Sequence, residues 1–280
     1  KGPDFSENKS LNESIEFYKK WNGAAGGRIT GAFAPHAIYT CSPEYIEAIR
    51  DAAEKYEAPI HVHLDETKVE HEDSLKNFGK TPARHLYDLG VFDRKTVAAH
   101  CVWVTGEDLE LLKEKGVSMV HNPTSNLKLA SGVAPVPAAM ADGVNVLLGT
   151  DGASSNNNLN MFEEINRAAL IHKGTTLNPL LISAAESLKM ATVNGAKALG
   201  REDLGIVKAG GKAYLILLDL DKPHFMPLHN PISALAYSAQ GSDVCLTMVD
   251  GRILYENGEF KTIDKEKVYY SIRKICERIF

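Results

Sequence analysis

Short apolar stretches and amphipathic stretches follow one another from residue 11 to about residue 200. The apolar stretches predict strands at residues 28–34, 59–64, 96–100, 117–121 and 144–148. The amphipathic stretches predict helices at residues 11–21, 43–56, 81–89, 105–115, 136–141 and 183–199. Since parallel strands are joined by crossover helices, this order predicts an α/β fold with a parallel sheet covered by helices.

The pattern changes after about residue 201. Strands are predicted there at residues 213–220, 244–249 and 252–255. Asp250-Gly251 is a strong hairpin turn between the last two strands, and a helix is predicted over residues 265–280. We therefore divide the chain into an α/β domain, residues 1–200, and a C-terminal β appendage with a terminal helix, residues 201–280.

Polar residues that could bind a metal or transfer protons gather at the ends of the predicted strands. Within residues 59–66, alternation puts three aliphatic side chains on one face and His61, His63 and Asp65 on the other. A neutral His63 can hold a metal ion, and Glu66, three residues later, can move protons. This pattern alone is weak, because histidines at strand ends are often ordinary hydrogen-bonded residues.

Three further residues strengthen that interpretation. His36, His100 and Asp151 each follow or end another predicted strand. The carboxyl ends of parallel strands meet at one edge of a sheet, where barrel enzymes keep their chemistry. The sequence therefore predicts that these side chains gather around one site.

Composition narrows the classes of function. The chain has 280 residues, 44% hydrophobic and 24% charged, which is typical of a soluble globular protein. Its formal net charge of −5 gives no electrostatic reason to expect nucleic acid or an anionic membrane as a partner. The four cysteines form no CxxC pair and predict reduced thiols in a cytoplasmic protein. The sequence shows no leading signal sequence and no apolar run long enough to cross a bilayer.

Four motifs together resemble the amidohydrolase superfamily, and within it the 5-methylthioadenosine/S-adenosylhomocysteine deaminases. They are His63-Leu-Asp-Glu66, Ala99-His100-Cys101, His121-Asn-Pro-Thr-Ser-Asn126 and Leu148-Gly-Thr-Asp151-Gly-Ala-Ser-Ser-Asn156. The resemblance runs over nearly the whole chain. It implies a (β/α)₈ metal-dependent hydrolase barrel, with about the last five strands present here, and a small β-sandwich appendage.

The resemblance also implies roles for individual residues. His63 and Asp151 match the fifth- and eighth-strand ligands of one divalent ion, expected to be zinc with iron as the alternative. Glu66 matches the carboxyl group that protonates the purine, and His100 the histidine beside the attacked carbon. Asp151 is also expected to take the proton of the attacking water. His36, Glu66, Asp151 and Ser155 are the expected substrate-binding residues.

The chain departs from the family pattern in one serious way. His61-Val62-His63 matches the HxH motif of the first-strand ligand pair. Its spacing along the chain to Glu66, His100 and Asp151 instead fits the fifth strand. The first three strands and their HxH pair are therefore missing from this sequence. We expect it to be the C-terminal part of a longer gene product.

Other polar residues receive no direct role at this stage. Asn-rich loops usually bind their own backbone, so residues 122–126 are interpreted as a loop of that kind. The remaining histidines are interpreted as surface or packing residues, namely His71, His85, His172, His224 and His229.

The leading hypothesis is hydrolytic deamination of an adenosine-type nucleoside, with a small-molecule substrate and a possible homo-oligomer. Another amidohydrolase reaction on the same site, of the guanine deaminase or triazine hydrolase type, is the first alternative. The second is a metal-free barrel remnant that acts as a binding or structural subunit, since two of four ligands should bind zinc poorly. Substrate and metal analysis separate the three.

Overall fold

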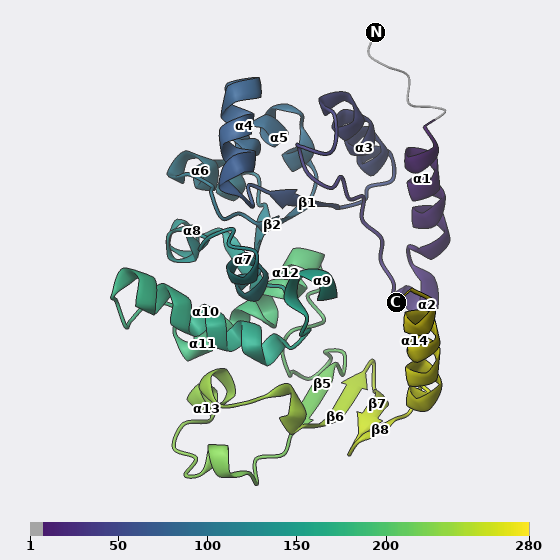
Figure 1. Ribbon diagram of the computed structural model, residues 1–280, viewed down its shortest axis with the longest axis vertical. Helices are drawn as coiled ribbons and strands as arrows, with labels where there is room; N and C mark the ends of the chain where they lie inside the picture. The colour runs from purple at the N-terminus through teal and green to yellow at the C-terminus, as the bar shows by residue number, and fades with distance from the viewer. Residues whose placement is uncertain (1–7, 280) are drawn as a thin grey trace.

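The chain folds around a four-stranded parallel sheet (Figure 1). The structure is a computed structural model that describes residues 8–279. The strands run in the spatial order β1 (Ile60–Leu64), β2 (Thr96–His100), β3 (Ser118–His121) and β4 (Asn145–Leu148). All three neighbouring pairs are parallel, so the four carboxyl ends lie along one edge. The predicted parallel sheet is confirmed for these four strands.

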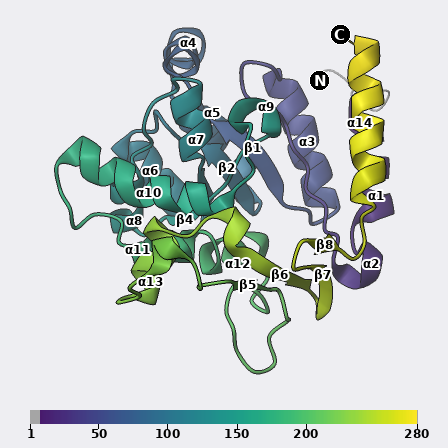
Figure 2. The same ribbon diagram turned by 60° about the horizontal axis from the view of Figure 1, so that its bottom comes forward.

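Helices follow the strands along the chain and flank the sheet (Figures 1 and 2). Their bounds are α1 (Lys9–Trp21), α2 (Ala24–Gly27), α3 (Pro43–Lys55), α4 (Lys68–Phe78), α5 (Pro82–Asp88), α6 (Gly106–Glu114), α7 (Pro123–Lys128), α8 (Val136–Asp142), α9 (Ala153–Asn156), α10 (Met161–Thr176), α11 (Ala184–Met190) and α12 (Val193–Leu199). Local sequence explains several of their starts. Ser42 caps α3 ahead of a proline in the first turn, and Thr105 forms a capping box with Asp108 on α6.

The two faces of the parallel sheet have different surroundings. Ile60, Val62 and Leu64 of β1 belong to the large hydrophobic core, together with residues of the covering helices. The opposite face carries a much smaller apolar cluster of Ala99, Val120 and Leu147 with Ala198. That opposite face has room for the polar side chains of β1, which alternate with the buried ones as predicted.

The C-terminal region forms a second, antiparallel sheet. Its strands run in the order β5 (Leu215–Leu218), β6 (Val244–Val249), β7 (Arg252–Glu256) and β8 (Glu259–Phe260). Helix α13 (Pro231–Tyr237) packs against α10 and α11, and Ala236 joins the large core. The two regions therefore share apolar packing, and the division at residue 200 stays a prediction.

The last helix, α14 (Lys265–Ile279), has no buried residue. It continues the chain after the antiparallel sheet and lies on the same side of the molecule as α1 and α2 (Figures 1 and 2). The predicted helix ended at residue 280, which lies outside the described residues, as do residues 1–7. Within residues 8–279 no helix is both long and apolar enough to cross a membrane.

Several predicted elements differ from the structure. The predicted strand at residues 28–34 is wrong, because that segment contributes one isolated bridge between Phe33 and Ile60. The expected count of five strands before Asp151 is therefore four. The predicted loop 122–126 is wrong as well, since α7 begins at Pro123, a residue that suits a helix's first turn.

Two other differences concern helices. The single helix expected over residues 183–199 is two helices, because the chain departs from helical geometry at Thr192 between α11 and α12. Helices α4, α10 and α13 were not predicted. Charged residues interrupt the apolar positions of α4 and α10, and α13 is only seven residues long, so their helical periodicity is weak in the sequence.

Candidate active site

His63 is held at the end of β1 by a single backbone carbonyl. Its backbone N–H and its ring Nδ1 both lie within hydrogen-bond distance of the carbonyl oxygen of His36, at 3.0 and 2.8 Å. A carbonyl oxygen only accepts, so Nδ1 carries the ring proton and donates it. The lone pair of His63 is therefore on Nε2, the tautomer that a metal-binding histidine with a carbonyl partner adopts.

Glu66 and His100 lie next to each other beyond the ends of β1 and β2. Nε2 of His100 is 3.7 Å from Oε2 of Glu66, and the His100 ring stacks on His63 with centroids 5.4 Å apart. Ser131 donates to the other carboxylate oxygen of Glu66 at 3.3 Å. On the far side of the His100 ring, Nδ1 lies 2.9 Å from Oδ1 of Asn126. With Nδ1 facing that amide oxygen, the other ring nitrogen, Nε2, faces Glu66.

Asp151 lies just after β4 and is held as a carboxylate. Its two oxygens accept from the backbone N–H of Gly152 at 2.7 Å and from the Ser125 hydroxyl at 2.6 Å. Burial opposes ionisation, but these bonds, the nearby His100 and the Ser155 hydroxyl outweigh it and keep the pKa of Asp151 below its usual value. Asp151 is therefore charged at neutral pH.

The expected substrate-binding residues border the same region. The ring of His36 lies 4.7 Å from that of His63, and its Nδ1 is 2.8 Å from the Thr40 hydroxyl. Ser155, on the short helix α9, approaches Asp151 closely enough to hydrogen bond to it. His36 thus adjoins His63 and Ser155 adjoins Asp151, and the role of each in binding stays a prediction.

His61 shares the polar face of β1 with His63, and the two ring centroids are 6.0 Å apart. Burial, followed by the neighbouring His63 and His100, lowers the pKa of His61. It is therefore neutral at physiological pH, which suits a packing residue beside the site.

The backbone bends sharply where these residues leave the sheet. Asp65, His100 and Asp151 have φ values of 51°, 72° and 60°, in the left-handed region. Aspartate and histidine tolerate this region better than most residues with a Cβ. The bend falls directly after β1, at the last residue of β2 and three residues after β4, so it turns the chain out of the strand direction at the carboxyl edge of the sheet.

The donor atoms of His63 and Asp151 fit a divalent ion in chemical type. The imidazole has a free lone pair on Nε2, and the carboxylate is ionised with both oxygens oriented by donors. Among residues 8–279, no three His, Cys, Asp or Glu side chains form a group that could hold a metal. The described part of the chain therefore offers two of the donors that a zinc site needs.

The structure also shows supporting residues that the sequence analysis missed. Ser125 and Asn126 come from α7, the segment interpreted as a self-bonded loop, and contact Asp151 and His100 instead. Ser131 contacts Glu66 from the segment after α7. The HNPTSN motif contained this signal, but only the fold shows which partners its polar side chains reach.

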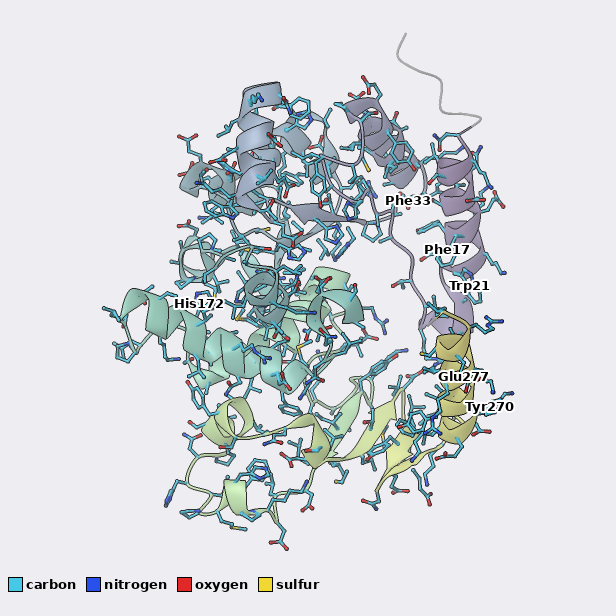
Figure 3. The ribbon with its side chains drawn as sticks, viewed as in Figure 1. Phe17, Trp21, Phe33, His172, Tyr270 and Glu277 are labelled. Carbon is cyan, nitrogen blue, oxygen red and sulfur yellow. The ribbon has the colours of Figure 1, made fainter. Side chains whose placement is uncertain are left out.

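A second pair of histidines is buried deeper in the fold. His172 lies on α10 (Figure 3). Its Nε2 is 3.3 Å from Nε2 of His121, at the end of β3. Burial lowers the pKa of His121 to about 3 and that of His172 to about 4. Both rings are therefore neutral, which agrees with the packing role predicted for His172.

The described cysteines Cys41, Cys101, Cys245 and Cys276 are all free thiols. Cys101 adjoins His100, and burial raises its pKa well above the usual value. It is therefore a neutral thiol and a poor nucleophile.

Histidines and carboxylates gather at the carboxyl ends of parallel strands, which is where many α/β hydrolases place their reacting groups. The sequence profile of the Amidohydrolase family matches residues 3–254. The chain therefore belongs to the amidohydrolase family.

The chain is similar to curated and solved members of this family. It is 53% identical over 272 residues to a 5-methylthioadenosine/S-adenosylhomocysteine deaminase of Caldanaerobacter subterraneus subsp. tengcongensis, covering 97% of this chain and 63% of the relative. The corresponding deaminase of Thermoanaerobacter pseudethanolicus is 52% identical, with the same coverage. The chain thus spans about 63% of the length of these relatives.

Solved structures extend the comparison. A zinc-bound adenosine deaminase from Xanthomonas campestris superposes with a TM-score of 0.93 at 35% identity, covering 98% of this chain and 62% of that one. A zinc complex of atrazine chlorohydrolase from Arthrobacter aurescens gives a TM-score of 0.89 at 27% identity, with coverages of 96% and 60%. The fold neighbours are thus metal hydrolases with a barrel fold, which agrees with the parallel sheet seen here.

Proposed function

We propose that this chain carries the substrate-facing half of a metal-dependent deaminase that hydrolyses an adenosine-type nucleoside to its inosine form and ammonia. 5′-Methylthioadenosine, S-adenosylhomocysteine or a related 5′-substituted adenosine is the proposed substrate. Support comes from the relatives named as such deaminases, at 53% and 52% identity, against 27% for the atrazine chlorohydrolase.

One arrangement carries the proposal. His63, Glu66, His100 and Asp151 leave the same edge of the sheet, and His100 links them through its ring contact with His63, its 3.7 Å approach to Glu66 and its electrostatic effect on Asp151. A carboxyl group that moves protons, an imidazole and a fixed carboxylate are the groups that addition of water to an amidine carbon requires.

His63 and Asp151 would hold one divalent ion, zinc or iron, and further donors are needed to complete its coordination. Such an ion, when bound, lowers the pKa of water toward neutrality. Asp151, fixed by Ser125 and Gly152, accepts a proton from the attacking water. His100, held through Nδ1, orients the attacking oxygen with Nε2.

Glu66 provides the complementary proton. It protonates N1 of the adenine ring, which lets C6 become tetrahedral while the ring accepts the electron pair. The proton that Asp151 took from water then passes to the amino group, so the C6–N bond breaks and ammonia leaves, and the C6 hydroxyl returns a proton to Glu66 as the carbonyl forms. General acid–base help of this kind contributes roughly 10²- to 10⁴-fold to a rate.

The test uses the protein expressed from its complete reading frame. Purified enzyme is assayed with methylthioadenosine, S-adenosylhomocysteine and adenosine by the change in purine absorbance, and its metal content is measured. Asp151→Asn is expected to lose both activity and metal, whereas Asp142→Asn, on the exposed end of α8, should retain both. Guanine and a triazine serve as the competing substrates.

Absence of turnover with every adenine nucleoside would overturn the proposal. Turnover of guanine or triazine instead would favour the other amidohydrolase reactions. A metal-free protein that binds a nucleoside without turnover would favour the non-enzymatic subunit.

A further inference from the structure

A second glutamate is buried directly behind Glu66. Glu70 lies in the first turn of α4 and is only 4% exposed. Its Oε2 accepts the backbone N–H of Glu66 at 2.7 Å, and among the described residues its Oε1 has no hydrogen-bond partner. The carboxyl group of Glu70 thus faces the backbone of the residue proposed to carry the proton.

The geometry of this bond differs from an ordinary helix cap. Thr67 caps α4 by accepting the N–H of Glu70 at 3.1 Å. In a capping box the glutamate then bonds back to the N–H of the cap residue itself, as Glu186 does with Ser183 on α11 at 2.6 Å. Glu70 instead reaches one residue further, to Glu66. The bond therefore holds the residue that faces the site.

The residue before Glu66 is fixed independently. The carbonyl of Asp65 accepts the N–H groups of Val102 and Trp103, both at 3.0 Å. Its carboxylate lies 2.9 Å from Nδ1 of His71. With Asp65 fixed on one side and the Glu66 amide fixed by Glu70, the backbone from which the Glu66 side chain leaves has little freedom.

We propose that Glu70 is a positioning residue that aims the Glu66 side chain at the substrate by binding the Glu66 amide. This inference rests on the proposed function for its effect on turnover. The role requires a hydrogen-bond acceptor rather than a charge. Burial raises the pKa of Glu70 to about 7, and a neutral carboxyl group still accepts through its carbonyl oxygen.

Three variants of the complete protein separate positioning from helix capping. Glu70→Met fills similar space without an acceptor, and Glu70→Gln keeps an acceptor without a charge. Glu186→Met removes the matching carboxyl group from the capping box of α11, far along the chain from the site. For each variant, kcat and KM are measured separately together with the melting temperature.

We expect Glu70→Met to lower kcat about 10- to 100-fold with KM changed less than about threefold, because small displacements of a reacting group have effects of this size. Glu70→Gln should stay within about threefold of wild type, and Glu186→Met should lower the melting temperature while leaving kcat unchanged. A kcat of Glu70→Met within twofold of wild type would overturn the proposal, as would an equal kcat loss in Glu186→Met. If Glu70→Met does not fold, Glu70→Leu, which also lacks an acceptor, must give the same result.

Amide hydrogen exchange at Glu66 tests the positioning without turnover. The Glu66 amide should exchange at least about tenfold faster in Glu70→Met than in wild type, while the later amides of α4 keep their protection. Unchanged exchange at Glu66 overturns the inference. Because this measurement needs no substrate, failure of the deaminase assay and failure of the Glu70 proposal are distinguishable.

Discussion

The parallel sheet and the antiparallel sheet of this protein have similar numbers of residues but differ in how deeply those residues are buried. Strands β1 to β4 are almost wholly buried on their apolar face, and their ends present the polar residues of the site. In β5 to β8 every residue is partly or fully exposed, and α14 has no buried side chain. Tight packing around the first sheet fixes side-chain positions to the accuracy that chemistry needs, and the second sheet shows no comparable constraint.

The largest expected effect tests whether the parallel-sheet edge carries the chemistry. Replacing Glu66 by Gln removes the proposed proton donor and should lower kcat by roughly 10²- to 10⁴-fold with little change in melting temperature. Glu110→Gln, on the exposed side of α6, is the matched control and should leave kcat unchanged. Activity of Glu66→Gln within tenfold of wild type would remove Glu66 from the mechanism.

The contrast in packing predicts a contrast in stability. Leu112 on α6 is fully buried, so Leu112→Ala should lower the free energy of unfolding by about 2–5 kcal/mol. Leu217 on β5 is 53% exposed, so Leu217→Ala should cost less than about 1 kcal/mol. Denaturant unfolding measures both. An equal cost at Leu217 would show that the antiparallel sheet is covered in the protein as it exists.

The pH dependence of stability should reveal the buried carboxyl group behind the site. Burial raises the pKa of Glu70 from 4.5 to about 7, so the folded state binds more protons than the unfolded state between these values. Stability contributed by neutral Glu70 is therefore complete below about pH 4.5 and is lost as pH rises through 7. Glu70→Gln should remove up to about 3 kcal/mol of this fall, measured by urea unfolding at pH 5 and pH 8. A fall of the same size in the variant would contradict the assignment to Glu70.

The smallest expected effect concerns Asp243, a buried carboxylate of the antiparallel region. Asp243 is buried and lies 2.8 Å from Nζ of Lys222 and 3.0 Å from Nε2 of His224. Asp243→Asn should lower the free energy of unfolding by about 1–3 kcal/mol, since hydrogen bonds to charged groups have this size. Asp203→Asn, which weakens the partly exposed pair with Arg201, should cost less than about 1 kcal/mol. Equal costs would mean that burial does not distinguish the two pairs.

Sequence patterns predicted the strands of the parallel sheet better than the segments that flank it. Buried strands such as β2 and β4 have continuous apolar runs, which periodicity detects. Residues 28–34 have a similar composition but form only the bridge at Phe33, because pairing depends on a neighbouring strand. The segment of α7 has a loop-like composition, and its helix follows from contacts that Ser125 and Asn126 make elsewhere.

The candidate site shows the same limit. His63, Glu66, His100 and Asp151 stand out in the sequence because histidines and carboxylates follow apolar strands. Glu70 does not, because its position matches an ordinary helix cap and only the fold shows that it bonds to Glu66 rather than Thr67. Local sequence therefore indicates which residues could take part in a reaction. The three-dimensional contacts indicate which other residues position them.

The left-handed backbone at Asp65, His100 and Asp151 restricts which amino acids can occupy these three positions. Valine, isoleucine and threonine are strongly disfavoured in that conformation, whereas glycine and asparagine adopt it readily. Substitution libraries at these three positions should therefore yield folded protein mainly with residues that tolerate the bend, whatever reaction is selected. New chemistry on this scaffold is easier to introduce in the following helices than at the turns themselves.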